Sequence, residues 1–347
     1  MQEIVSDRSL IRNMITFEIA LAKVQAKAGV IPATAASEIG KVFGSIGIEP
    51  ADLSGGTLQN GIPVVSFLSL ILERLSDENQ KYLHHHATSQ DVMDTAQSMI
   101  IRDAITVIKN AITGIIPALT DLRARHGATK CMARTRGQLA APITFGNKID
   151  TWLTPIEQLL KQLSVLENEV VCVQLGGPVG TYDDEGIARA LATEMNLGYR
   201  KSWHSQRNSL SDFTNWLATL TGILGKMGSD ILTMAQSEVG EVEETAGGGG
   251  KSSSMPHKNN PVLSEALIAI ARINAGLQSI QLQSVIHSNE RDGAALIIEW
   301  SVIPRMLINT ATALTHASKI STNIKVNAAV MEKNVSDFLA KGQTKSN

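Results

Sequence analysis

The chain has 347 residues, of which 43% are hydrophobic but only 4% aromatic, so its core must be built from aliphatic side chains rather than rings. The formal net charge of -2 gives no basic surface for nucleic acid, and two cysteines, Cys131 and Cys172, are too few for a disulfide framework or a cysteine zinc site. No cationic leader opens the chain and no uninterrupted apolar run reaches about 18 residues, so we expect a cytoplasmic protein without a membrane span.

Residues 1–97 are predicted to form a small N-terminal helical domain. A helix is expected at about residues 15–28, where Gly29 and Pro32 stop it. A Gly- and Pro-rich passage follows at residues 55–63. These elements are shorter than those that follow, which indicates a separate domain.

Residues 98–326 carry apolar seams at helical spacing, which predict long helices of about 30 Å each. Seams of this length need equally long partners, so we expect an all-α bundle and an oligomer. The seams are Ile101, Ile105, Ile108, Ile112, Ile115, Leu119 and Leu122; Ile149, Leu153, Ile156, Leu160 and Leu163; Leu210, Phe213, Leu217, Leu220, Leu224, Met227, Ile231 and Met234; and Leu263, Leu267, Ile270, Leu277 and Ile280. Gly222, Gly225 and Gly228 would allow close backbone approach. The last stretch, 327–347, shows no strong pattern and is expected to be a short tail that frays at its polar end.

The first segment with reactive side chains is 84–91, three histidines followed by Ala, Thr, Ser, Gln and Asp. Adjacent histidines do not share a helix face, so a metal site is not expected there. Thr88 and Ser89 stand just before a predicted helix, where two hydroxyls and a helix N-terminus suit a carboxylate. Simple N-capping would explain both residues equally well.

Four other positions suit anions or proton transfer. Arg136, with Arg134 beside it, lies near a predicted loop-to-helix change and suggests anion handling, with solvated surface charge as the alternative. Gln174 precedes a turn rich in glycine. A helix C-cap would explain the glycines of this turn but not the glutamine. His204 is suited by the ordinary pKa of histidine to move a proton near neutrality. Arg291 also suits an anion, and a surface ion pair is the alternative explanation for this residue.

Residues 247–261 join four glycines to a dense set of polar side chains between two prolines. A run of glycines is tolerated mainly where the backbone must approach a ligand or close over it, which predicts an active-site lid; a flexible linker is the alternative. A phosphate-binding P-loop is excluded, because its first glycine would fall at Thr245 and Pro256 interrupts the helix that must follow.

Together these segments resemble the fumarase/aspartase superfamily over nearly the whole chain. Its signature, Gly-Ser-Ser-x-Met-Pro-x-Lys-x-Asn-Pro, matches residues 251–261 except that Lys251 takes the first glycine position. Phe-Glu-Ile-Ala-Leu-Ala at 17–22, Thr-Ser-Gln-Asp at 88–91 and Trp-His-Ser-Gln-Arg at 203–207 resemble the branch of bacterial 3-carboxy-cis,cis-muconate cycloisomerases, or lactonizing enzymes.

The resemblance implies a long-helix bundle at 98–326 with a catalytic loop at 246–261, and a homotetramer whose active sites are shared between subunits. It implies an isomerase of aromatic-acid (protocatechuate, beta-ketoadipate) catabolism that acts on a di- or tricarboxylate. The enzyme would close 3-carboxy-cis,cis-muconate, or a similar 3-substituted muconate, to its muconolactone. A carboxylate of the substrate adds intramolecularly through an enediolate, and no cofactor or metal is needed.

The resemblance also implies roles for individual residues. Ser252 falls at the place of the catalytic serine of the mobile loop, and Lys258 would stabilise its alkoxide. Arg136 is expected to bind the 3-substituent and His204 to act as an acid. The residues expected to bind substrate are Thr88, Ser89, Arg136, Gln174, Arg207, Asn260 and Arg291.

Two departures from the family pattern bear on the reaction. Thr-Arg-Gly-Gln at 135–138 stands where lyases of the family have Thr-His-Gly-Gln, which argues against ordinary release of ammonia or fumarate. The chain also ends about where relatives begin a further helical domain, so the C-terminal domain is expected to be shortened or absent. An adenylosuccinate lyase-like elimination that releases fumarate is the alternative activity, and a noncatalytic structural role is another.

Overall fold

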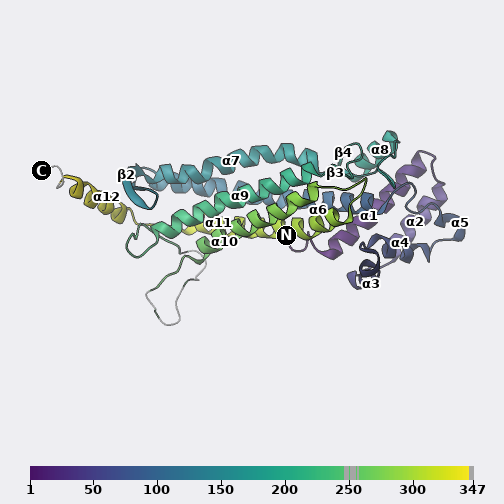
Figure 1. Cartoon of the computed structure of the whole chain (residues 1–347), viewed down its shortest axis with the longest axis horizontal. Coiled ribbons are helices and arrows are strands. Elements are labelled where there is room, and N and C mark those ends of the chain that lie inside the picture. Colours follow the sequence, from purple (N-terminus) through teal and green to yellow (C-terminus); the bar gives the residue numbers. More distant parts are fainter. Residues whose placement is uncertain (246–249, 251–254, 256–257, 344–347) are drawn as a thin grey trace. The chain divides into compact units, whose positions relative to one another are not determined.

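The computed structural model describes residues 1–245, 250, 255 and 258–343, which are predominantly helical (Figure 1). The chain divides into two compact units, each made of three stretches. Unit 1 comprises Met1–Thr106, Ser164–Thr214 and Ile280–Pro304, and unit 2 comprises Val107–Leu163, Asn215–Ser279 and Arg305–Asn347. The all-α class predicted from the sequence is confirmed.

The helices are α1 (Asp7–Lys27), α2 (Ala33–Ser45), α3 (Pro50–Asn60), α4 (Val64–Leu72), α5 (Asp77–Gln80), α6 (Ser89–His126), α7 (Phe145–Val170), α8 (Glu185–Met195), α9 (Asn208–Met234), α10 (Val262–Gln281), the 3₁₀ helix η1 (Leu282–Val285), α11 (Gly293–Asn323) and α12 (Ala328–Gln343). The strands are short and lie in pairs: β1 (Lys130–Thr135) with β2 (Gln138–Thr144), β3 (Cys172–Val173) with β4 (Gly198–Tyr199), and β5 (Val242–Glu243) with β6 (Lys325–Val326). The pair β3–β4 is parallel and the other two are antiparallel.

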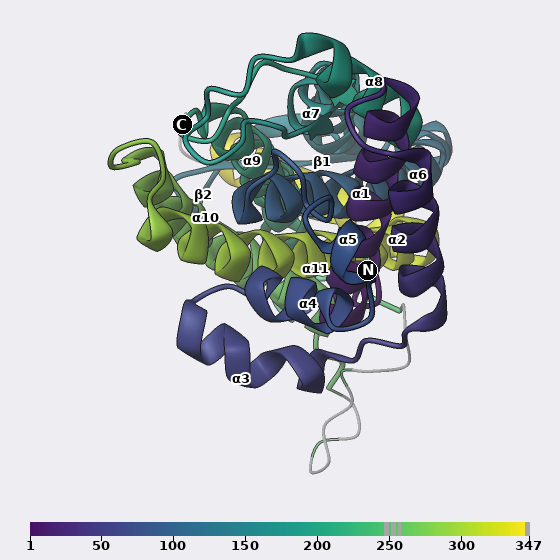
Figure 2. The ribbon, with the colours of Figure 1, turned by 90° about the vertical axis from the view of Figure 1, so that its right-hand side faces the viewer.

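Helix α1 shows how local sequence sets the N-terminal elements. The hydroxyl of Ser6 caps the helix by accepting a hydrogen bond from the Ser9 amide. The buried face carries Met14, Phe17 and Leu21, spaced by three and four residues. The helix stops at Lys27, as predicted, but it begins at Asp7 rather than near residue 15. It packs against α2 and α8, while α2 packs against α4 (Figure 2).

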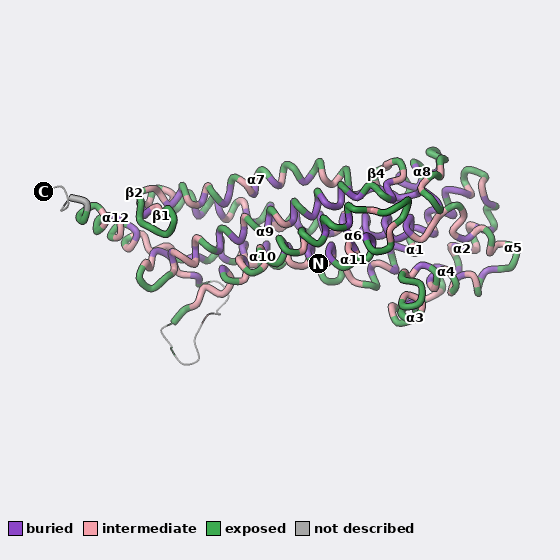
Figure 3. The backbone as a smooth tube through the Cα atoms, in the orientation of Figure 1, coloured by how far each residue is buried: buried purple, intermediate pink, exposed green. Residues whose placement is uncertain are grey.

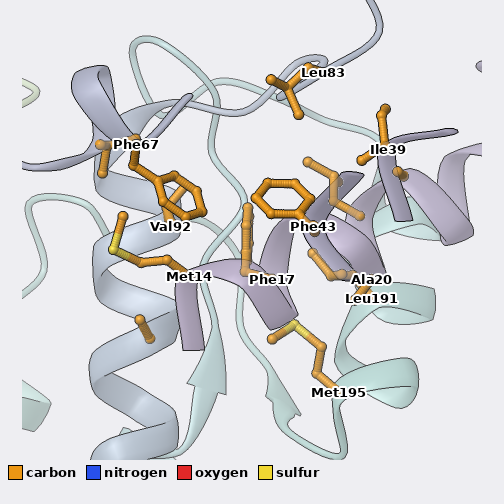
Figure 4. Packing of buried hydrophobic residues seen from close by; sticks show 14 of the residues in the cluster. Met14, Phe17, Ala20, Ile39, Phe43, Phe67, Leu83, Val92, Leu191 and Met195 are labelled. Carbon is orange, nitrogen blue, oxygen red and sulfur yellow. The ribbon is translucent and has the colours of Figure 1, made fainter. Parts of the chain in front are cut away.

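An aliphatic and phenylalanine core holds these short helices together within unit 1. The rings of Phe43 and Phe67 stack with centroids 5.5 Å apart, and Phe17 of α1 lies near them (Figure 4). Leu191 and Met195 of α8 belong to the same cluster. Burying each of these side chains contributes about 1.5–3 kcal/mol, which offsets the cost of ordering such short helices.

The long seams predicted for α6 and α9 are confirmed, because every apolar residue of both seams is buried. Figure 3 shows buried residues recurring along both helices. On α7, Leu160 is only half-buried and its neighbour Leu159 takes the inner position.

The seam predicted for α10 is wrong in part, because Leu267 is buried but Ile280 is exposed. The other predicted positions, Leu263, Ile270 and Leu277, are only half-buried, and Ser264, Asn274 and Gln278 take the inner positions.

Close backbone approach between α9 and α10 explains the small side chain of Ser264 on the inner face of α10. In unit 2, a Cβ added to Gly228 would lie 2.6 Å from the carbonyl oxygen of Ser264, so only glycine fits; Gly225 is equally close to Ala271. The close approach expected for these two glycines is confirmed, whereas Gly222 has open space around it.

The tail after Val326 is more regular than expected, because it forms α12. Met331 and Val335, four residues apart, are buried, and α12 packs against β1. The amide of Asn334 donates to the Val239 carbonyl (3.0 Å) and to Glu241 (3.1 Å). Two buried apolar residues form too short a pattern to indicate a helix by themselves, and these long-range contacts supply the rest. The division into 1–97, 98–326 and 327–347 stays a prediction.

Helix α11 is the one described helix that is long and apolar enough to cross a membrane by length and composition. Residues such as Met306 and Leu314 are buried inside the protein. A core helix of a bundle meets the same criteria, so this helix alone does not indicate a membrane span.

Candidate active site

The N-terminus of α6 presents the hydroxyls of Thr88 and Ser89, both half-buried, in unit 1. The Thr88 hydroxyl accepts a hydrogen bond from Nη2 of Arg291 (2.7 Å), and the same nitrogen donates to the carbonyl of Pro178 (2.8 Å). Arg291 is exposed, so it can also meet a solute. Two hydroxyls, a helix N-terminus and a guanidinium make this place, which we call the anion seat, suitable for a carboxylate.

Asp91, in the first turn of α6, holds the backbone of the anion seat in place. Its Oδ2 accepts hydrogen bonds from the amides of Thr88 (2.9 Å) and Gly177 (3.0 Å). Its Oδ1 accepts from the amide of Gly176 (2.8 Å) and contacts Nε2 of His204 (2.7 Å). No role was predicted for Asp91 from the sequence, although an acidic residue three positions after a threonine N-cap is a recognisable capping signal.

His204 is buried, with 3% of its surface exposed, and both of its ring nitrogens face protein. Nε2 contacts Asp91, whereas Nδ1 is buried without a hydrogen-bond partner among the described residues. The structure therefore places His204 under the anion seat rather than on its surface.

Gln174 is also directed inward. Its Oε1 accepts from the Trp203 amide (3.0 Å) and its Nε2 donates to Asp94 (3.3 Å), and the residue is fully buried. The amide thus joins β3 to the segment that carries His204.

Arg207 is fully buried between two carboxylates. Its guanidinium forms two bonds to Asp94, and it also binds Glu299 through Nε (3.0 Å) and Nη2. Burial alone would lower the pKa of Arg207, but Asp94 and Glu299 raise it above its usual value. Burial raises the pKa of Glu299, and Arg207 opposes that rise. Every nitrogen of the guanidinium already donates to a carboxylate, so the geometry does not favour Arg207 as a substrate ligand.

The three adjacent histidines have three different neighbours. His84 Nδ1 contacts Oε1 of Glu18 (2.6 Å), whereas the His86 ring stacks on Tyr182 with centroids 5.4 Å apart. His85 lies edge-on to Tyr82. Over the described ranges, no group of three or more His, Cys, Asp or Glu side chains is placed to hold a metal ion.

The signature segment belongs to unit 2, and Ser252 lies outside the described residues. Lys258 is exposed and its amide donates to the Met255 carbonyl (3.0 Å); Asn260 is half-buried and its amide donates to the Gly250 carbonyl (2.9 Å). Gly250 has a φ of 86°, and a Cβ there would lie 2.2 Å from the carbonyl oxygen of Asn260. A glycine is therefore required at this crossing.

Glu244 fixes the start of α10, directly after the signature. Its carboxylate accepts hydrogen bonds from the amides of Leu263 (2.8 Å) and Ser264 (3.0 Å) and from the Ser264 hydroxyl (2.7 Å). This capping holds the chain that carries Asn260. Glu244 was not recognised as a capping residue from the sequence, because it lies many residues before the helix that it caps.

Arg136 lies exposed in the turn between β1 and β2, since Thr135 pairs with Gln138. The expected loop-to-helix change near Arg134 and Arg136 is wrong, because α7 starts only at Phe145. Arg134 forms an ion pair with the buried Glu241 (3.5 Å). Of the predicted site residues, the structure thus brings Thr88, Ser89 and Arg291 together in the anion seat. It buries Gln174, His204 and Arg207 within the same unit.

Known proteins are similar to this chain over most of its length. A family model described as Lyase matches residues 1–275. The 3-carboxy-cis,cis-muconate cycloisomerase of Acinetobacter baylyi is 34% identical, and the match covers 96% of this chain and 76% of that protein. An adenylosuccinate lyase of Methanocaldococcus jannaschii is 29% identical over 96% of this chain and 74% of its own length.

A solved structure is also similar. The 3-carboxy-cis,cis-muconate lactonizing enzyme of Pseudomonas putida matches with a TM-score of 0.91 and 32% identity, over 97% of this chain and 77% of that chain. Because the family model covers most of the chain and the Acinetobacter relative matches nearly all of it, the resemblance to the fumarase/aspartase superfamily is confirmed, and this protein belongs to that lyase family.

Proposed function

We propose that this protein is a cycloisomerase that closes 3-carboxy-cis,cis-muconate, or a similar 3-substituted muconate, to its muconolactone. The observation that carries the proposal is the anion seat, in which Arg291 and Thr88 are already joined at the N-terminus of α6. The names and similarity of the relatives point to the same reaction.

The reaction moves bonds within one molecule. A carboxylate oxygen of the substrate adds to a conjugated carbon, one C–O bond forms, and the electron pair of the double bond moves onto the neighbouring carboxylate as an enediolate. A proton then joins the α-carbon. Donors placed in advance around the enediolate lower this barrier, each by about 3 kcal/mol. Holding the flexible substrate in its ring-closing shape supplies a further large part.

Roles follow for the residues that can reach a solute. Thr88 and Ser89 would clamp the carboxylate that becomes the enediolate, and Asn260 keeps the substrate-binding role implied by the resemblance. Ser252 and Lys258 keep the catalytic roles implied by the resemblance. For Gln174 and Arg207 we propose a positioning role in place of direct contact, because their polar atoms are bonded inside the protein.

The 3-substituent needs a cation of its own, and Arg291 and Arg136 are the candidates. Arg291 is the better placed, because it already contacts Thr88 in the anion seat. We expect Arg291→Ala to raise the KM for 3-carboxymuconate at least tenfold while changing that for unsubstituted muconate less. If Arg136→Ala alone produces this difference, Arg136 is the residue that binds the substituent.

The protein is further proposed to be a cytoplasmic homotetramer with active sites shared between subunits, acting without a cofactor. A mixture of two inactive variants, Thr88→Ala and Ser252→Ala, tests the shared site, since hybrid tetramers would regain some activity. Light scattering would report the tetramer directly.

A direct assay tests the activity itself. Loss of substrate absorbance, with the product identified by NMR, should show turnover of 3-carboxymuconate. Adenylosuccinate, the substrate of the alternative reaction, serves as the comparison. Fumarate released from adenylosuccinate, with no lactone formed from muconates, would reject the proposal in favour of the lyase.

A further inference from the structure

We infer that Asp91 and His204 form a buried positioning pair, in which Asp91 fixes the proton of His204 on Nε2 and holds the backbone of the anion seat in place. The consequence for catalysis rests on the proposed function, whereas the pairing itself does not.

The carboxylate of Asp91 makes four polar contacts. Three are the backbone amides of Thr88, Gly176 and Gly177, at 2.8 to 3.0 Å. Backbone amides can only donate, and three of them favour the charged form of the carboxylate, so the proton of the remaining contact belongs to the more basic imidazole. The fourth contact, 2.7 Å to Nε2 of His204, must then also be a donation. A neutral His204 therefore carries its proton on Nε2.

The other ring nitrogen is directed at the glycine turn. A Cβ added to Gly176 would lie 2.8 Å from Cε1 of His204, and one added to Gly180 would lie 3.4 Å from Nδ1. Nδ1 has no hydrogen-bond partner in the described part of the chain. Neither nitrogen of His204 thus faces the hydroxyls of Thr88 and Ser89, so the ring acts through Asp91 and not on the substrate.

The pair sets the shape of the anion seat from two sides. Asp91 holds the Thr88 amide on one side and the Gly176 and Gly177 amides on the other. Pro178 comes next in the chain, and its carbonyl and the Thr88 hydroxyl are the two acceptors of Arg291. A shift of the Asp91 carboxylate would therefore move apart the two acceptors that bind the Arg291 guanidinium.

The first test is Asp91→Asn, which keeps the size of the side chain but replaces one acceptor oxygen by a donor. The amide nitrogen of the new side chain would face at least one of the donors that now contact Asp91. The backbone of the anion seat should therefore be held less firmly. We expect the Kd for propane-1,2,3-tricarboxylate, measured by calorimetry, to rise about tenfold or more, the effect of leaving one buried donor unpaired. The matched control is Asp103→Asn, a half-buried aspartate further along the same helix that pairs with Arg102, and it should leave the Kd unchanged.

The second test reads the proton directly. Nitrogen-15 spectra of histidine-labelled protein, with His204 assigned by its loss in His204→Gln, should show the proton on Nε2 in the native protein. A proton on Nδ1 of a neutral ring would overturn the inference, whether or not the protein turns over muconates.

The third test separates positioning from acid catalysis. The amide of His204→Gln can still donate to Asp91, whereas His204→Leu cannot. A positioning role predicts that the Gln variant recovers most of the kcat that the Leu variant loses. Equal loss in both variants, with tricarboxylate binding intact, would mean that His204 is the acid and that the inference is wrong. Failure of the native protein to turn over any muconate, with the Asp91→Asn binding result as expected, would reject only the proposed function.

Discussion

Arg207 and Asp94 meet through two parallel hydrogen bonds, Nη1 to Oδ2 and Nη2 to Oδ1, each 2.9 Å long. Glu299 holds the rest of the guanidinium, so one buried cation joins α6, the start of α9 and α11 within unit 1. Such a cluster is costly to form, but it is far more costly to break.

Removing the cation should be strongly destabilising. In Arg207→Met two carboxylates stay buried without their partner, and we expect a loss of about 3–5 kcal/mol in the free energy of unfolding. Urea unfolding followed by circular dichroism measures it. The control is Arg189→Met, which breaks an exposed pair with Glu185 and should cost less than about 1 kcal/mol. A similar small loss for both variants would show that the buried cluster is not structural.

The His84–Glu18 pair should make stability depend on pH. Burial alone would lower the pKa of His84, but the Glu18 carboxylate raises it above the usual value. A raised pKa means that the folded state holds the proton more tightly than the unfolded chain. The contribution is therefore complete below about pH 6.5 and is lost as the pH rises through the folded-state pKa.

The measurement compares the melting temperature of the native protein with that of His84→Gln from pH 6 to pH 9. The stability advantage of the native protein should shrink towards high pH. Both proteins share all other titratable groups, so the difference between their melting temperatures cancels the effect of those groups. An advantage that grows with pH would contradict the assigned direction.

Glu244 should stabilise α10 and the chain that enters it. Glu244→Ala leaves two amides of the first turn and the Ser264 hydroxyl without their acceptor, which should cost about 1–2 kcal/mol. Glu265, exposed in the same first turn, provides the control variant Glu265→Ala. Because Asn260 lies just before the helix, Glu244→Ala should also lower turnover, and equal stability of the two variants would count against the capping role.

The sequence was most informative where the pattern is local. The seams of α6 and α9 could be predicted because each buried residue follows the last by three or four positions. The place of Thr88 and Ser89 at the start of a helix could be predicted because a helix N-terminus has a local signature. In contrast, Arg207 pairs with residues 113 and 92 positions away, and no local sequence pattern indicates a bond over such a separation. The burial of Arg207 could therefore not be predicted from the sequence.

The hairpin of β1 and β2 was missed for a related reason. Strand β2 is exposed along most of its length, so it shows no alternation of apolar and polar residues. The turn is Arg136-Gly137, with φ values of 52° and 83°, where Asn-Gly or Asp-Gly would be the usual signal. The inward orientation of Gln174 and His204 was also unpredictable, because it depends on Asp94 and Asp91, which lie 80 and 113 positions away, respectively.

The arginine in that turn supports a last prediction. A left-handed φ is unfavourable for arginine and easier for asparagine, so Arg136→Asn should stabilise the protein by about 0.5–1 kcal/mol, measured by urea unfolding. Arg189→Asn, on an exposed helical surface, is the control and should give no gain. If Arg136→Asn stabilises the protein and also weakens turnover of 3-carboxymuconate, the arginine is retained for its charge at the expense of the turn. Unchanged turnover would leave Arg291 as the residue that binds the substituent.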